Sequence, residues 1–235
     1  MASAREIQQT MRALGDKDLA QQAQRYFKTG KGEYGEGDKF LGIRVPVTRK
    51  VAKQFKDTNL VEIEKLLQSR FHEERLLAVI MLANIAQKAD EETLQNIFNI
   101  YLHNTHMINN WDIVDSSAPG IVGRYLYHKD RAILYKLANS DSLWEKRIAI
   151  LATFYFIQQN DFTDALALAE LCLTETHDLI HKASGWMLRE VGNKDQKQEE
   201  GFLKQYYQQM PRTMLRYAIE KFPEAKRQAY LKGKV

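Results

Sequence analysis

The sequence contains few of the residues that interrupt helices or cross-link a chain. Its 235 residues include 4 prolines, 12 glycines and 1 cysteine. Five of the glycines fall between Gly30 and Gly42, so the remaining chain is almost free of helix breakers and is expected to be mostly helical. The lone cysteine, Cys172, excludes an internal disulfide and any metal site built from several cysteines.

The chain also lacks long apolar runs. Its first ten residues, MASAREIQQT, contain no apolar signal core, and no run approaches the roughly 20 residues that span a bilayer. We therefore expect a cytoplasmic protein with no membrane partner. Hydrophobic residues make up 44% of the chain and charged residues 27%, which is typical of a soluble globular protein and argues against disorder.

The net charge of +4 is small, but the charge is unevenly distributed. Between Lys204 and Lys234 there are eight basic and two acidic residues, a local balance of +6 that leaves −2 for the preceding chain. Such a tail is either a solvated helix surface or an edge that binds a polyanion. A second basic cluster, from Lys39 to Lys56, follows the glycine-rich stretch and lies on a helix expected to begin at Pro46.

The glycine-rich stretch imitates a cofactor motif. Residues 30–35 match the G-x-G-x-x-G pattern of dinucleotide-binding loops. That pattern binds pyrophosphate only between a strand and a helix, whereas the preceding Leu19, Ala23 and Phe27 repeat at helical spacing. We therefore expect no cofactor, and we interpret the stretch as a mobile connection between helices.

Apolar residues recur with the period of an α-helix along most of the chain. Residues 91–102 and 161–173 are amphipathic, whereas 76–86 and 148–157 are apolar almost all round. Half-buried helices that alternate with fully buried ones are typical of an all-α solenoid, in which each helix pair buries its apolar face against its neighbours. The predicted layout is a single domain, 1–235, with a helical N-terminal part (1–28), a glycine-rich loop (29–43) and repeats from about 46 to 232.

Five segments from the inner helices of this predicted stack can be superposed. One position, here called the aligned column, is basic in four segments and acidic in one; its spacings of 40, 32, 35 and 34 residues are close to helical repeat periods. The basic members either join neighbouring repeats structurally or line a groove for a phosphate backbone. The segments begin at His72, Asp112, Trp144, Leu179 and Thr213. The aligned column consists of Arg75, Asp115, Arg147, Lys182 and Arg216.

Tryptophans accompany the aligned column at two places. Trp111 precedes the acidic member, Asp115, by four residues, and Trp186 follows Lys182 by four, so both indoles are expected on the face of the column. Tryptophan is often a core residue, which is the interpretation kept for Trp144. Two indoles beside a carboxylate and basic residues suit a cationic aromatic group carried on an anionic polymer. Because a carboxylate can stabilise positive charge on a sugar ring, these features indicate an N-alkylated purine in DNA.

At these residues the sequence resembles the AlkD-like family of DNA alkylation repair glycosylases. The resemblance lies in FLGIRVP (40–46), NWDIVDSS (110–117), SLWEKRIAIL (142–151) and KASGWMLRE (182–190), and it is weakest at the N-terminal helices and beyond Lys194. It implies a HEAT-like α-solenoid whose concave basic groove binds duplex DNA. The implied activity is hydrolytic excision of positively charged alkylpurines, such as 3-methyladenine and 7-methylguanine, without base flipping.

The resemblance also implies roles for individual residues. The glycine-rich loop is longer here than in the family's pattern, which leaves the geometry near Arg44 open. We expect no metal, no obligate protein partner and a monomer that acts on duplex DNA containing alkylated bases. The implied catalytic residues are Asp115, Trp111, Trp186 and Arg147. The expected DNA contacts are Lys182, Arg189, Arg44, Arg49 and Tyr26.

Three other interpretations stay open at this point. A paralogue without catalysis would bind duplex DNA and excise nothing. A helical-repeat scaffold for protein partners would show no salt-dependent affinity for DNA. A metal enzyme is the weakest alternative, because His103/His106 and His177/His181 have helical spacing but no matching acidic or cysteine partner.

Overall fold

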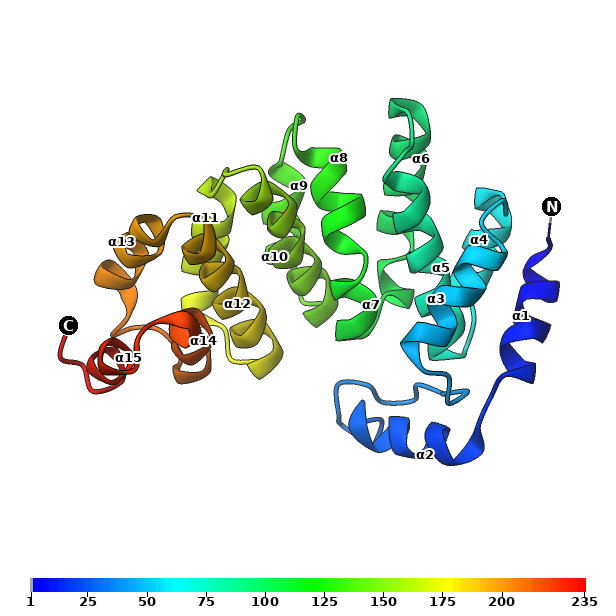
Figure 1. Cartoon of the computed structure of the whole chain (residues 1–235), viewed down its shortest axis with the longest axis horizontal. Coiled ribbons are helices and arrows are strands. Elements are labelled where there is room, and N and C mark those ends of the chain that lie inside the picture. The colour runs from blue at the N-terminus through cyan, green and yellow to red at the C-terminus, as the bar shows by residue number, and fades with distance from the viewer. Residues whose placement is uncertain (1) are drawn as a thin grey trace. The chain divides into compact units, whose positions relative to one another are not determined.

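Helices account for the regular structure of the protein in a computed structural model that describes residues 2–235 (Figure 1). Within the described residues, extended pairing is limited to one isolated bridge between Lys39 and Phe71, which confirms the predicted all-α class. The contacts divide the chain into two compact units, one ending at Ser117 and the other starting at Ala118. The single-domain organisation stays a prediction.

The first unit contains seven α-helices among its described residues. α4 packs against α1 and α5, and α5 also contacts α3, α6 and α7. The helices are α1 (Ala4–Ala13), α2 (Lys17–Tyr26), α3 (Val45–Gln54), α4 (Leu60–Leu67), α5 (His72–Ala86), α6 (Glu91–His103) and α7 (Trp111–Asp115), with a 3-10 turn at Thr105–Met107.

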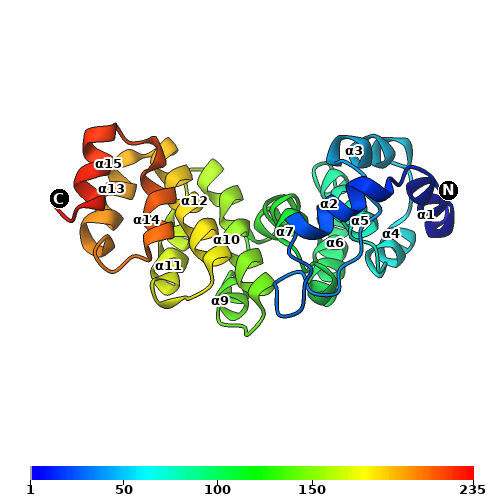
Figure 2. The ribbon, with the colours of Figure 1, turned by 90° about the horizontal axis from the view of Figure 1, so that it is seen from below.

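The second unit also consists of helices packed side by side. α12 packs against α10 on one side and α14 on the other, as both views show (Figures 1 and 2). Its helices are α8 (Arg124–Leu126), α9 (Ala132–Ala138), α10 (Leu143–Gln158), α11 (Thr163–Leu171), α12 (Asp178–Lys194), α13 (Gln196–Tyr206), α14 (Arg212–Ala218) and α15 (Glu224–Leu231), with a π turn at Pro119–Gly123 and 3-10 turns at Cys172–Thr174 and Ile219–Lys221.

The helices follow the hydrophobic pattern closely. The two segments predicted to be buried on all sides lie in α5 and α10, where Leu77, Leu82, Leu151 and Phe156 are fully buried. The amphipathic segments became α6 and α11, and α3 starts at Val45, one residue before the expected Pro46. None of the described helices combines the length and the apolar composition needed to cross a bilayer.

The repeat register predicted from the five superposed segments is also confirmed. Each segment begins in the first turn of a different inner helix, namely α5, α7, α10, α12 or α14. Equivalent residues of successive segments therefore stand at equivalent places in successive repeats. This register positions the candidate functional residues described below.

The glycine-rich loop follows a helix, α2. It therefore lacks the preceding strand that a dinucleotide-binding loop has. The expectation of a simple mobile connection needs correction in its second half. The backbone N–H of His72 donates to the Lys39 carbonyl (2.8 Å). Gly42 has φ of +80°, and a Cβ there would lie 2.0 Å from the Asp16 carbonyl oxygen. The loop is therefore fitted closely between α2 and α5, and only glycine fits at this position.

Candidate active site

α7 carries two of the predicted catalytic residues on a very short helix. Trp111 is its first residue and Asp115 its last, four residues apart and thus on one face; both are half-buried. The side chain of Asn110 caps the helix by accepting the backbone N–H of Trp111 (2.9 Å). Because five residues do not form a stable helix alone, contacts with the rest of the unit must hold α7 in place.

Aromatic rings from α2 and the following loop surround Trp111. The ring of Phe27 stacks on the indole, with centroids 5.3 Å apart and an interplanar angle of 22°. Tyr26 meets the indole edge-on at 6.0 Å and is itself 66% exposed. Phe27 stacks in turn on Phe40 at 5.0 Å. The predicted DNA contact Tyr26 thus lies beside the predicted catalytic Trp111.

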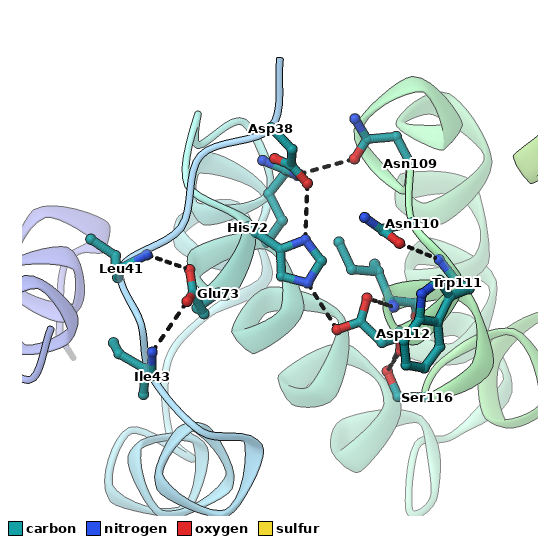
Figure 3. Close-up of polar contacts among 12 residues, drawn as sticks. Asp38, Leu41, Ile43, His72, Glu73, Asn109, Asn110, Trp111, Asp112 and Ser116 are labelled. Carbon is teal, nitrogen blue, oxygen red and sulfur yellow. Dashed lines mark hydrogen bonds and ion pairs between the residues drawn. The ribbon is translucent and has the colours of Figure 1, made fainter. Parts of the chain in front are cut away.

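A buried histidine joins α7 to the glycine-rich loop (Figure 3). His72, on α5, has Nε2 2.8 Å from Asp112 Oδ2 and Nδ1 3.0 Å from Asp38 Oδ2. Since two ionised carboxylates can only accept, both ring nitrogens must donate, and the ring is an imidazolium. Burial lowers the pKa of His72, but the charges and hydrogen bonds of Asp112 and Asp38 outweigh it and raise the pKa to about 9.

Arg75, the first member of the aligned column, is a structural residue. Its buried guanidinium donates to Asp38 (2.7 Å) and Asn109 (3.0 Å) and to the backbone carbonyls of Ser69 and Met107 (both 3.0 Å). Of the two interpretations, the structure therefore supports the connection between repeats, because the side chain holds the segment that leads into α7. With Asp38 it completes an alternating cluster of two cations and two carboxylates around His72.

The neighbouring Glu73 fixes the loop that approaches the cluster. Its buried carboxylate accepts the backbone N–H groups of Leu41 (2.8 Å), Gly42 (2.8 Å) and Ile43 (3.2 Å). Three N–H donors compensate the charge of this carboxylate, which would otherwise be costly to bury. The loop is thereby held against the first turn of α5 (Figure 3).

A pocket of about 350 Å³ lies between α2, this loop and α5. Its lining is mainly apolar and aromatic, with Phe27 and Phe40 beside His72, Glu73 and Asp112. Arg44, a predicted DNA contact, lines the same pocket and is exposed. Arg49, on α3, is also exposed.

Asp115 lies near the fully buried Tyr101. Burial raises the pKa of Tyr101, the hydrogen bond with Ser117 lowers it, and the charge of Asp115 raises it further. The hydroxyl of Ser117 also lies within hydrogen-bond distance of the Ile113 carbonyl (2.6 Å). The end of α7 that carries the carboxylate is thus anchored to α6.

The second unit holds the other predicted catalytic residues. Trp186 is half-buried on α12; its Nε1–H donates to Glu190 on the next turn (2.9 Å), and its ring lies 6.1 Å from that of Phe154. Arg147 is buried on α10 and donates to the Leu179 carbonyl (2.6 Å). Arg75 donates in the same way to the Met107 carbonyl, and in both cases the acceptor lies 32 residues further along the chain. Arg147 therefore also connects successive repeats.

The other basic residues expected to bind DNA in this unit are paired with acids. Lys182 bonds Asp178 (2.7 Å), and Arg189 bonds Glu190 (3.3 Å) and Glu220. A phosphate would have to compete with these carboxylates. Arg216 is exposed, and Trp144 is half-buried rather than fully enclosed in the core.

The sequence reasoning overlooked His72 and Asp38. His72 was visible as the first residue of a superposed segment, at the position equivalent to Asp112 in the next repeat. A histidine and an aspartate at equivalent positions of adjacent repeats were a signal for the contact between His72 and Asp112, whereas no such signal pointed to Asp38. Among residues 2–235, no group of three or more histidine, cysteine or acidic side chains is arranged to hold a metal ion.

Fold and site together define a helical-repeat protein in which a tryptophan and a carboxylate share one turn of an inner helix. The sequence matches the family model of DNA alkylation repair enzymes over residues 7–222, and the chain belongs to that family. A role in DNA repair, with DNA as partner, follows from this membership. The resemblance noted from the sequence is thus confirmed.

A solved structure supports the fold. It is described as a "Predicted DNA alkylation repair enzyme from Enterococcus faecalis" and is similar to this chain with a TM-score of 0.69 and 17% sequence identity. The similarity covers 89% of this chain and 97% of that one. No curated protein matches the sequence.

Proposed function

We propose that this protein is a DNA glycosylase that hydrolyses the N-glycosidic bond of positively charged alkylpurines in duplex DNA. The observation that carries the proposal is the pairing of Trp111 and Asp115 on one face of α7, in a chain of the DNA alkylation repair family. Asp112, the other carboxylate of α7, is bonded to His72. We assign the chemistry to Asp115 because it shares a helix face with Trp111 and because the resemblance to the family implies a catalytic aspartate at this position.

The chemistry follows from the charge of the substrate. An alkylated purine cation is a good leaving group, so no acid is needed to protonate it. As the bond from C1′ to the base nitrogen breaks, its electron pair leaves with the base, which departs neutral, and positive charge develops on the deoxyribose. Asp115 stabilises that charge and orients a water, whose oxygen bonds to C1′ while its proton passes to the surrounding solvent.

The tryptophans pack against the deoxyribose and attract the cationic lesion through their ring faces, an interaction of roughly 0.5–2 kcal/mol. Trp111 is held for this role by its stack with Phe27. Trp186 and Arg147 are assigned to the same reaction, with Lys182, Arg189 and Arg44 at the flanking phosphates and Arg49 and Tyr26 as further contacts. The base is excised without being flipped into a pocket, and neutral lesions are poor substrates.

The test is release of 7-methylguanine from methylated duplex DNA under single-turnover conditions. Asp115→Asn preserves the shape of the side chain and removes its charge, so we expect a loss of about 100-fold or more. The matched control is Asp57→Asn, an exposed aspartate of the same unit, which should excise at the parent rate. An Asp115→Asn variant as fast as the parent would refute the mechanism.

Binding measured over a range of salt concentrations separates the remaining alternatives. An enzyme with phosphate contacts loses affinity for duplex DNA steeply as salt rises. Salt-dependent binding without base release would instead identify a non-catalytic DNA-binding protein. Absence of salt-dependent binding would identify a protein-interaction scaffold.

A further inference from the structure

α7 has too little structure of its own to place its functional residues. Its five residues form little more than one turn, and its side chains contact Tyr26 of α2 and His72 of α5. Asp112 lies between Trp111 and Asp115 in the sequence and points toward α5 (Figure 3). Its Oδ1 accepts the N–H of Ile113 (2.9 Å), while Oδ2 accepts from His72 (2.8 Å). The contact with His72 thus ties the first turn of α7 to α5.

His72 is itself fixed from the opposite side. Its side chain is 2% exposed, and its Nδ1–H donates to Asp38 of the glycine-rich loop. The charged groups that face the ring are Asp38 from the loop, Asp112 from α7 and Arg75 from α5, which neutralises Asp38. Without the imidazolium of His72, the carboxylates of Asp38 and Asp112 would have to share the charge of Arg75.

A second route from His72 to Trp111 runs through aromatic rings. The imidazole stacks on Phe40 at 4.5 Å and lies 4.9 Å from Phe27, which stacks on Trp111 at 5.3 Å. The polar route ends at the residue after Trp111, and the aromatic route ends on the indole itself. Both routes begin at one buried side chain that the proposed chemistry does not use.

We propose that His72 is a positioning residue for base excision: by holding Asp112, it orients the turn of α7 that carries Trp111 and Asp115. The inference rests on the proposed function for those two residues. A residue that only stabilised the fold would act through both hydrogen bonds of His72. The positioning role instead depends on one of them, the bond to Asp112. The bond to Asp38 secures the ring but does not reach α7.

Two substitutions separate these bonds. The amide nitrogen of glutamine reaches about as far as Nε2, so His72→Gln keeps a donor for Asp112; that of asparagine lies near Nδ1, so His72→Asn keeps a donor for Asp38. Misplacement of reacting groups by about 1 Å can cost on the order of 100-fold in rate. We expect single-turnover excision to fall about 10- to 100-fold in His72→Asn and less than about 5-fold in His72→Gln, with duplex affinity within about 2-fold of the parent in both.

Equal losses of rate in the two variants, or a greater loss in His72→Gln, would overturn the proposal. A loss that appears in affinity rather than in rate would also do so. If His72→Asn fails to fold, Asp112→Asn and Asp38→Asn replace the pair, and the proposal requires the larger loss of rate in Asp112→Asn.

Hydrogen exchange of the backbone amides of residues 111–117 tests the inference without a substrate. His72→Asn should exchange at least about 10-fold faster there than His72→Gln, because local opening is governed by the contacts that hold the segment. Unchanged protection in His72→Asn overturns the positioning role even if the enzyme is active. A parent protein that releases no base refutes the proposed function instead, and exchange still decides whether His72 holds α7.

Discussion

Trp111 and Trp186 are carried by helices of very different length, and different forces hold them. Trp186 lies near the middle of α12, which has 17 residues, so its backbone is fixed by the helix itself. Trp111 begins a helix of 5 residues and depends on groups from α5, α2 and the glycine-rich loop. Trp111 is therefore placed by tertiary contacts, whereas Trp186 is placed by secondary structure.

The chemical nature of the contacts differs as well. Around Trp111 the support is a buried cluster of charges, formed by His72, Asp38, Arg75 and Asp112. Beside Trp186 the support is close packing: a Cβ on Gly185 would lie 2.4 Å from the Met214 carbonyl oxygen. A charged support responds to pH and to loss of a hydrogen bond, whereas a packed one responds to added volume. The two regions should therefore fail under different perturbations.

The largest effect is expected from removing the carboxylate that holds the loop near Trp111. Glu73→Ala leaves the N–H groups of Leu41, Gly42 and Ile43 without their acceptor, and each bond to a charged group contributes about 1.5–3 kcal/mol. We expect the free energy of unfolding in urea to fall by about 3–5 kcal/mol. Glu92→Ala, an exposed glutamate of the same unit, should change it by less than about 0.5 kcal/mol. Similar values for both variants would contradict a supporting role for Glu73.

The next effect is a pH dependence that comes from His72. Its folded pKa of about 9 exceeds the unfolded value of 6.5, so the folded protein holds an extra proton between these values. The resulting stability is complete below pH 6.5 and is lost as the pH rises to about 9, by about 3 kcal/mol. Urea unfolding at several pH values measures this loss, and His72→Gln should abolish it.

Glu199, in the second unit, provides an internal control for the pH dependence assigned to His72. Burial and the neighbouring charge of Glu200 raise the pKa of Glu199 to about 8, although Lys226 and Arg189 oppose the shift. For this acid the stability falls between about pH 4.5 and 8, a lower window than that of His72. Glu199→Gln should remove the lower part of the pH dependence and leave the upper part. A single variant that removed both parts would show that the two groups had been assigned wrongly.

The sequence was sufficient for the class of fold and for the register of the repeats. Apolar periodicity marked α5, α6, α10 and α11, because helix burial depends on spacing along the chain. The superposed segments marked the first turns of the inner helices, because each repeat meets its neighbour in the same way. These features are local or repeated, and such features can be recognised without coordinates.

The support of the site could not be predicted in the same way. Asp38 lies in a loop with no periodicity, so nothing in the sequence shows that it returns to His72 and Arg75. The basic members of the aligned column likewise differ in role: Arg75 is buried among acceptors, whereas Arg216 is exposed. Which interpretation applies to each depends on the partners that the fold brings to it, not on its residue type.

The smallest expected effect probes the packed support of Trp186. Gly185→Ala adds a methyl group that would lie 2.4 Å from the Met214 carbonyl oxygen and 2.6 Å from Tyr217 Cβ, so α12 and α14 must separate. We expect a loss of about 1–3 kcal/mol in the free energy of unfolding, with no change in its pH dependence. Gly201→Ala on α13 is the matched control, because nothing lies within 4 Å of its added methyl group. There the gain in helix propensity should stabilise the protein by about 0.5–1 kcal/mol. The comparison of the two regions depends on these opposite signs, since equal destabilisation at both glycines would mean that close packing does not distinguish the surroundings of Trp186.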